Sequence, residues 1–110
     1  MATVFKNVLL TGLGTTPTTV LTSNGSATTT VIGMSLSNTS SDIVQVNIQI
    51  QDTVASTSAY YVYGLTIPPN SSARVVSGGE KLNLGPLTNV IMTGNTTASL
   101  DLVMSWVEIS

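Results

Sequence analysis

The sequence predicts an all-β protein: an antiparallel β-sandwich of jelly-roll-like form, with seven to eight short strands and no significant helix. Runs rich in β-branched residues recur about every 8–12 residues, and turn-forming residues separate them. Several runs alternate apolar and polar residues, which is the two-residue period of a strand. No window of useful length carries the 3.6-residue apolar period of a helix. With 110 residues the chain fits a single domain over residues 1–110.

The first predicted element spans Thr3–Leu13, and its apolar residues occur on both sides of the alternation. We expect residues 1–14 to form either an opening strand or an extended N-terminal arm that reaches a neighbouring molecule. On the arm interpretation, deletion of Ala2–Leu13 weakens attachment to that neighbour and leaves the sandwich folded.

Two strands are predicted next, over Thr18–Thr22 and Thr28–Asn38. The first is rich in β-branched residues, as short strands are. Asn24 and Gly25 lie between them, and this pair tolerates positive φ at both central positions of a tight turn. The sequence therefore predicts a hairpin that joins the two strands.

Alternation assigns an inward face to two strands, Thr28–Asn38 and Ile43–Gln51. Apolar residues of the second strand alternate with Gln and Asn along almost its whole length, which is typical of a strand with one buried and one wet face. The predicted inward residues are Ile32, Met34, Leu36, Val44, Val46, Ile48 and Ile50.

Later strands are predicted on both sides of breaks at Pro68-Pro69 and Gly78-Gly79. Proline cannot donate to a β-ladder, and paired glycines leave the backbone flexible. These strands cover Tyr60–Ile67, Ser72–Ser77, Asn89–Thr93 and Ser99–Ile109.

The last predicted strand is apolar on both of its faces. One face carries Leu100, Leu102, Met104 and Trp106, and the other carries Val103, Val107 and Ile109. A strand of this kind is normally buried on both sides. We therefore expect a central strand that its own domain covers on one face and another molecule covers on the other.

Composition excludes several classes of function. The chain has no cysteine and no histidine, so thiolate chemistry and the usual general base are missing. Only 7% of residues are charged, against about 25% in ordinary soluble domains. Three basic residues and a net charge of −2 argue against binding to nucleic acid or anionic membranes. We expect no enzymatic activity, no metal and no cofactor.

Targeting signals are not evident in the sequence. The apolar cluster after Lys6 is short and is interrupted by Thr11 and Gly12, so it does not have the form of a secretory signal. No run approaches the roughly 20 apolar residues of a membrane-spanning helix. We expect synthesis in the cytoplasm and no membrane partner.

Carboxylates and asparagines offer weaker candidate sites. The five carboxylates are interpreted as solvated turn or edge residues, because none occurs in a calcium-loop pattern. Four asparagines begin Asn-x-Ser/Thr triplets, and turn chemistry explains them better than glycosylation does. These residues are Asp42, Asp52, Glu80, Asp101 and Glu108, and Asn24, Asn38, Asn70 and Asn95.

Aromatic residues could form a platform for a sugar, which would make the chain a carbohydrate-binding β-sandwich module. Alternation places Tyr61 and Tyr63 on one strand face and Tyr60 on the other. Trp106 belongs to the apolar series of the last strand. We therefore favour a place in the core or in an oligomer interface for these side chains.

Several sequence blocks follow one another along the last two-thirds of the chain: Ser37-Asn38, Val44-Gln45-Val46-Asn47-Ile48, Tyr60-Tyr61-Val62, Ile67-Pro68-Pro69-Asn70-Ser71-Ser72, Gly79-Glu80-Lys81-Leu82 and the terminal Ala98–Ile109. In the order of these blocks, this part of the chain resembles small virion structural proteins of tailed bacteriophages, particularly those of marine and cyanobacterial phages. The resemblance carries no catalytic residue.

The resemblance implies a non-enzymatic virion protein, for which we favour a capsid decoration or cement protein that stabilises the head by binding capsomers. Its expected partners are itself, as a homotrimer, and the major capsid protein or another virion protein. The expected location is the capsid surface, and the alternative is a neck, tail or fibre component. We expect the assembly interface to include Phe5, Leu9, Leu10, Tyr60, Val62, Val103, Val107 and Ile109.

Overall fold

The computed structural model describes residues 3–76, 81–96 and 99–109. Within these ranges the chain forms nine strands and no helix, so it contains no helix that could cross a membrane. The all-β prediction is confirmed, with one strand more than the upper count because β7 forms where the sequence predicts a loop. The strands are β1 (Thr3–Leu13), β2 (Thr18–Thr22), β3 (Thr28–Asn38), β4 (Val44–Asp52), β5 (Thr57–Ile67), β6 (Ser71–Val76), β7 (Leu82–Leu84), β8 (Thr88–Gly94) and β9 (Leu100–Ile109).

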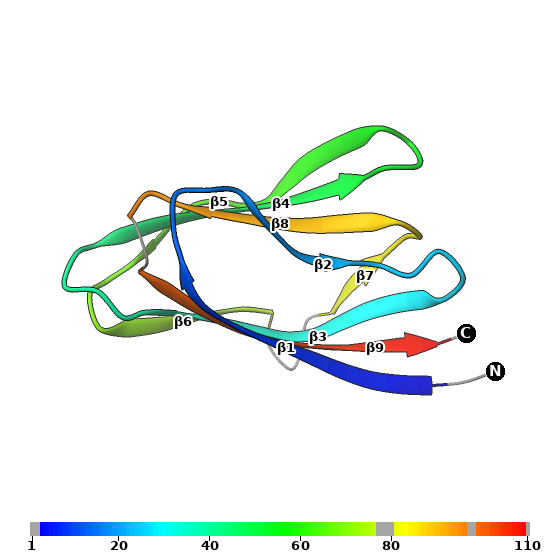
Figure 1. Ribbon diagram of the computed structural model, residues 1–110, viewed down its shortest axis with the longest axis horizontal. Coiled ribbons are helices and arrows are strands. Elements are labelled where there is room, and N and C mark those ends of the chain that lie inside the picture. The colour runs from blue at the N-terminus through cyan, green and yellow to red at the C-terminus, as the bar shows by residue number, and fades with distance from the viewer. Residues whose placement is uncertain (1–2, 77–80, 97–98, 110) are drawn as a thin grey trace.

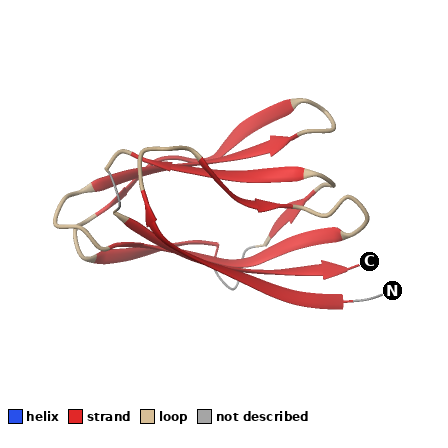
Figure 2. Cartoon of the chain, viewed as in Figure 1, coloured by secondary structure: helices blue, strands red, loops and turns tan. Residues whose placement is uncertain are grey.

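Two antiparallel sheets face each other and form a sandwich (Figures 1 and 2). One sheet has the order β1-β9-β3-β6, and β7 pairs with β3 beside β6. The other sheet has the order β2-β8-β4-β5. The two chain ends lie close together at one end of the molecule (Figure 1).

Strand pairing is nested along the chain. β1 pairs with β9, β2 with β8, β3 with β6 and β4 with β5. The chain is thus one long antiparallel ribbon that doubles back at the β4–β5 turn, and its successive pairs alternate between the two sheets. This arrangement is that of a jelly roll, with β7 as an addition. The jelly-roll-like prediction is confirmed.

The core lies between the sheets and depends on β9. This strand runs between β1 and β3, so the predicted central position is confirmed. Leu100, Leu102 and Met104 on its inner face are at most 1% exposed. They meet side chains of the second sheet, where Val46, Ile48, Val90 and Met92 are buried.

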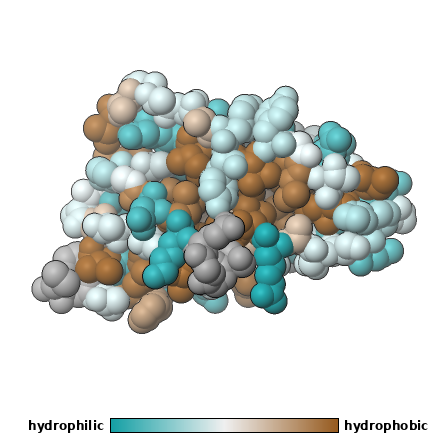
Figure 3. Space-filling view, turned by 180° about the vertical axis from the view of Figure 1, so that it is seen from behind, coloured by the Kyte–Doolittle hydropathy of each residue, from teal (hydrophilic) through white to brown (hydrophobic). Residues whose placement is uncertain are grey.

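Several large apolar side chains remain on the surface of the chain. Seen from behind, the molecule is a mosaic of apolar and weakly polar residues, and strongly hydrophilic groups are scattered among them (Figure 3). With 7% charged residues, the chain has few groups with which to cover exposed apolar atoms.

A bulge in β3 overturns one predicted core residue. Val31 lies opposite Trp106 and Gly33 lies opposite Ser105, so two steps along β3 match a single step along β9. The extra residue, Ile32, is 36% exposed, and Val31 takes the core position instead. Alternation alone cannot locate a bulge, which reverses the facing of every residue before it.

The predicted Asn24-Gly25 hairpin is wrong. β2 and β3 belong to different sheets, so the segment between them is a crossover rather than a hairpin turn. The Asn24 Oδ1 atom accepts hydrogen bonds from the Ser26 backbone N–H at 2.8 Å and from its hydroxyl at 2.9 Å. Asparagine favours such local turns whether or not the flanking strands pair.

Residues 3–13 form a paired edge strand and not a free arm. β1 follows β9 from Thr3 opposite Ile109 to Leu13 opposite Leu100. Its bulge is fixed by Gly12, whose φ is +66° and whose N–H donates to Asp101 Oδ1 at 3.2 Å. Deletion of Ala2–Leu13 would remove a whole strand, so the expectation that the sandwich stays folded without it is abandoned.

Turn chemistry accounts for the asparagine triplets in the described residues. The Asn38 side chain is buried and donates to the carbonyl oxygens of Asp42 at 2.7 Å and Ile67 at 3.0 Å. Asn95 Oδ1 accepts the Gln45 backbone N–H at 2.9 Å. The predicted break at Gly78-Gly79 lies outside the described residues.

Thr29 gives a test of the packing. Its hydroxyl is buried with no hydrogen-bond partner among the described residues, and it lies opposite Glu108 and Leu84. We expect Thr29→Val to raise the free energy of unfolding by about 1 kcal/mol or more, because the substitution removes an unsatisfied buried polar group. Urea unfolding measures the change.

The neighbouring Thr30→Val variant is the control. The Thr30 hydroxyl donates to Asn83 Oδ1 at 2.8 Å at the surface, so its removal brings no gain. A Thr29→Val protein less stable than the wild type would contradict the packing described here.

Candidate assembly surface

The outer face of the five-stranded sheet gathers apolar side chains from β1, β3 and β9. On this face Phe5 lies opposite Val107 and Leu9 lies opposite Val103. Ile109 continues the row on β9, and the bulge in β3 adds Ile32. We call this surface the apolar face and define it by Phe5, Leu9, Ile32, Val103, Val107 and Ile109.

Most of the apolar face is open to solvent. Phe5 is 75% exposed, Leu9 66% and Val103 51%. Hydroxyl and amide side chains interrupt it, with Ser105 opposite Asn7 and Ser35 opposite Val103. Contiguous exposed apolar residues with a polar border are typical of surfaces that bind another macromolecule.

Two shallow hollows lie on this side of the sheet. One, of about 320 Å³, is lined by residues that include Val103 and Arg74. The other, of about 430 Å³, is lined by residues that include Phe5 and Lys6. Ile32 and Ser105 line both hollows, so the bulge in β3 forms part of the wall between them.

Five of the eight predicted interface residues lie together on the apolar face: Phe5, Leu9, Val103, Val107 and Ile109. The other three lie elsewhere. Leu10 is opposite Leu102 and Val62 is opposite Ile48, so both side chains pack against the core. Tyr60 belongs to β5 in the other sheet.

Ile32 is the member of the apolar face that the sequence does not reveal. Ile32 stands two residues before Met34 and four before Leu36, so regular alternation places all three on the inner face. Only the bulge turns Ile32 outward. Gly33 is a weak signal for that bulge, since glycine inside a strand often marks one.

Comparison with known proteins identifies the fold. No protein-family model matches the sequence, and no curated protein matches it. Among solved structures, one match is to a chain of the capsid asymmetric unit of cyanophage Pam1, with 18% identity and a TM-score of 0.52 over 99% of this chain and 84% of that chain.

Two further solved structures match. A chain of the Bacillus endospore appendages, which form a family of disulfide-linked pili, is 14% identical with a TM-score of 0.57, over 98% of this chain and 88% of that chain. A chain of infectious bursal disease virus, Gx strain, is 10% identical with a TM-score of 0.57. It covers 96% of this chain, which spans 33% of that longer one. At these low identities, the structural similarity shows a shared fold and no more.

The carboxylates of Asp52 and Asp101 serve local structure. Asp52 Oδ1 accepts the backbone N–H groups of Val54 and Ala55 at 2.9 and 3.1 Å and so caps the β4–β5 turn. Asp101 holds the Gly12 bulge. No group of three or more Asp, Glu, His or Cys side chains in the described ranges is placed to hold a metal ion.

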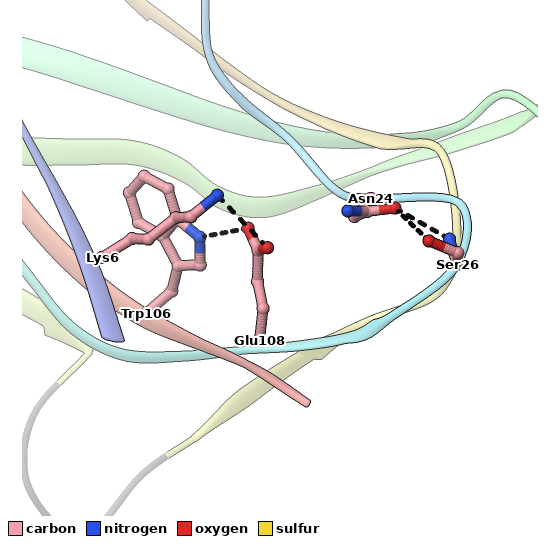
Figure 4. Close-up of polar contacts among 5 residues, drawn as sticks. All are labelled: Lys6, Asn24, Ser26, Trp106 and Glu108. Atoms are coloured by element: carbon pink, nitrogen blue, oxygen red, sulfur yellow. Dashed lines mark hydrogen bonds and ion pairs between the residues drawn. The ribbon is translucent and has the colours of Figure 1, made fainter. Parts of the chain in front are cut away.

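Glu108 joins β1 to β9 on the face of the sheet opposite to the apolar face (Figure 4). It forms an ion pair with the Lys6 ammonium group at 3.3 Å and accepts the Trp106 indole N–H at 3.1 Å. The Trp106 hydrogen bond, helped by Lys6, lowers the pKa of the Glu108 carboxyl below its usual value. The cluster fixes β1 next to β9 at the position where Phe5 points outward.

Acid should therefore weaken the fold partly through Glu108. Because its pKa is lower in the folded chain, the ionised carboxylate stabilises the fold above its unfolded pKa of about 4.3, and this contribution is lost as pH falls through the lower folded value. We expect Glu108→Gln to lose less thermal stability than the wild type between pH 7 and pH 3. Far-UV circular dichroism melts measure this, and identical losses in the two proteins would contradict it.

Proposed function

We propose that this chain is a non-enzymatic structural protein of a tailed-phage virion, a decoration or cement protein that stabilises the head by binding capsomers. The observation that carries the proposal is the apolar face, which is nearly uncharged and open to solvent in the single chain. In this role it is made in the host cytoplasm and resides on the capsid surface as a homotrimer over a local three-fold axis.

Three facts support a role in assembly. Jelly rolls are recurrent in viral capsid domains, although a fold alone does not fix a function. The fold is shared with a chain of a cyanophage capsid asymmetric unit. The low charge of the chain removes most of the repulsion between neighbouring copies, and many copies on one particle allow each contact to be weak.

The apolar face suits a partner surface that is also apolar at its centre. Phe5 and Leu9 project from β1, and burying side chains of this size contributes about 1.5–3 kcal/mol each. Arg74 at the border of the first hollow offers a planar fork for a carboxylate of the major capsid protein. Phe5 and Leu9 would supply the binding energy, and the Arg74 cation would orient the partner.

Attachment should depend on the apolar face and not on exposed apolar residues in general. We expect the Phe5→Thr, Leu9→Thr double variant to keep a stability within about 0.5 kcal/mol of the wild type, because both side chains are exposed and threonine suits a strand. Its affinity for heads that lack this protein should fall by at least about tenfold, a loss of about 1.4 kcal/mol. Co-sedimentation measures the affinity.

The matched control is Ile43→Thr, Val54→Thr. These residues are 60% and 65% exposed and lie in turns away from the apolar face. The control should bind heads as the wild type does. Equal loss in both variants, or no loss in the Phe5 and Leu9 variant, would contradict the proposed surface.

Copy number distinguishes the head from the neck, tail or fibre. We expect quantitative mass spectrometry of purified particles to find this chain in amounts comparable to the major capsid protein, because a cement protein binds at every equivalent site. A small fraction of that amount would move the chain to the neck or tail. Absence from particles would overturn the virion role altogether.

A further inference from the structure

The outer face of the other sheet has a different chemistry. Its outward positions on β2, β8, β4 and β5 carry hydroxyl, amide and aromatic side chains, with Ile91 as the aliphatic exception, and no charged residue. In register they form cross-strand rows, such as Thr22, Asn89, Gln51 and Ser58, followed by Thr19, Ile91, Gln49 and Tyr60.

Two bulges in β5 bring Tyr60 and Tyr63 to this face. Tyr60 lies opposite Gln49 and Val62 opposite Ile48, so Tyr61 is an extra residue between them. A second irregularity follows at Gly64, whose φ is +70° and whose N–H donates to Asn47 Oδ1 at 2.8 Å. Tyr60 and Tyr63 are three residues apart, so regular alternation would place them on opposite faces of β5. The bulge at Tyr61 brings both onto the same face.

The rings of this pair meet edge to face, with centroids 4.8 Å apart and planes at 67°. Tyr60 remains 55% exposed and Tyr63 remains 73% exposed. Tyrosine has only two side-chain torsions, so a ring held by its neighbour loses little entropy when it binds a ligand. Neither ring therefore lies in the core, and an oligomer interface for them stays a prediction.

A polar relay runs beside the rings. The Thr22 hydroxyl donates to Asn89 Oδ1 at 2.7 Å, and Asn89 Nδ2 donates to Gln51 Oε1 at 3.0 Å. Because Gln51 Oε1 accepts this hydrogen bond, the orientation of the Gln51 amide is set, and its NH2 group is left to donate to a ligand. Gln51 and Ser58 also line a hollow of about 320 Å³ at the β4–β5 turn.

We propose that the Tyr60–Tyr63 pair and the adjacent Gln49 and Gln51 amides bind a neutral glycan. The C–H face of a pyranose ring stacks on an exposed aromatic ring, and side-chain amides both donate to and accept from sugar hydroxyl groups. Because the rings stand at 67°, one sugar unit can lie flat on only one of them, so the second ring forms a wall. The absence of charge from the outward positions favours a neutral sugar over an anionic one.

This site is independent of the role in the virion, since it lies on the opposite sheet from the apolar face. A chain that binds capsomers through one sheet can present the other outward. Single contacts of this size are weak, so many copies on one particle would be needed for firm adhesion to a glycan-coated surface.

The test is a titration of the isolated ¹⁵N-labelled chain with maltohexaose, cellohexaose and chitohexaose, each followed by NMR. We expect at least one of them to shift amide signals of β4, β5 and β8 with a dissociation constant of about 1 mM, near the weak limit of specific binding. Tyr63→Ala should weaken that binding at least about tenfold, and Tyr63→Phe should keep most of it because the ring face remains.

Phe5→Ala is the matched control, because Phe5 is an equally exposed aromatic residue on the opposite sheet. It should leave the glycan shifts unchanged. The glycan site would be overturned by amide shifts confined to other strands. It would also be overturned if none of the three sugars caused a shift at a concentration about 10-fold above the expected dissociation constant. Loss of head attachment in Tyr63→Ala without any glycan binding would assign this face to a protein partner instead.

Discussion

The packing of β9 between β1 and β3 is the interaction on which the rest of the structure depends. Its inner residues fill the core along the whole length of the five-stranded sheet, and its backbone is hydrogen-bonded on both sides. The last strand therefore pairs with the first, across about the full length of the sequence. Such distant contacts favour slow folding, because loop-closure entropy must be overcome before these contacts form.

Nested pairing also explains how one small domain offers two unlike surfaces. Each sheet uses one face for the shared core and leaves the other outward. On the five-stranded sheet most of the outward residues of β1 and β9 are aliphatic or aromatic, whereas on the four-stranded sheet they are mostly amides and hydroxyls. The first surface suits a protein partner and the second suits a ligand rich in hydroxyl groups.

Bulges determine which residues reach these surfaces. The bulge in β3 turns Ile32 outward between the two hollows, and the bulges in β5 bring Tyr60 and Tyr63 together. In each case one additional residue reverses the facing of the strand. Both outward surfaces therefore contain positions at which regular alternation fails.

The sequence by itself determined the fold class and the core of the regular strands. Alternation located the buried residues of β4, and the doubly apolar Ser99–Ile109 segment identified a central strand with an outward apolar side, because burial follows a two-residue period wherever pairing is regular. It also grouped Phe5, Leu9, Val103, Val107 and Ile109, which the structure places on one face of the sheet.

Only the tertiary structure decided strand pairing, bulges and the sheet to which each strand belongs. Asn24 has the chemistry of a hairpin turn, yet β2 and β3 lie in different sheets. Likewise Tyr60 and Tyr63 share a face only because β5 must match the register of β4. Local residue types set the conformations a segment can adopt, whereas register depends on contacts between segments far apart in the chain, which local sequence does not encode.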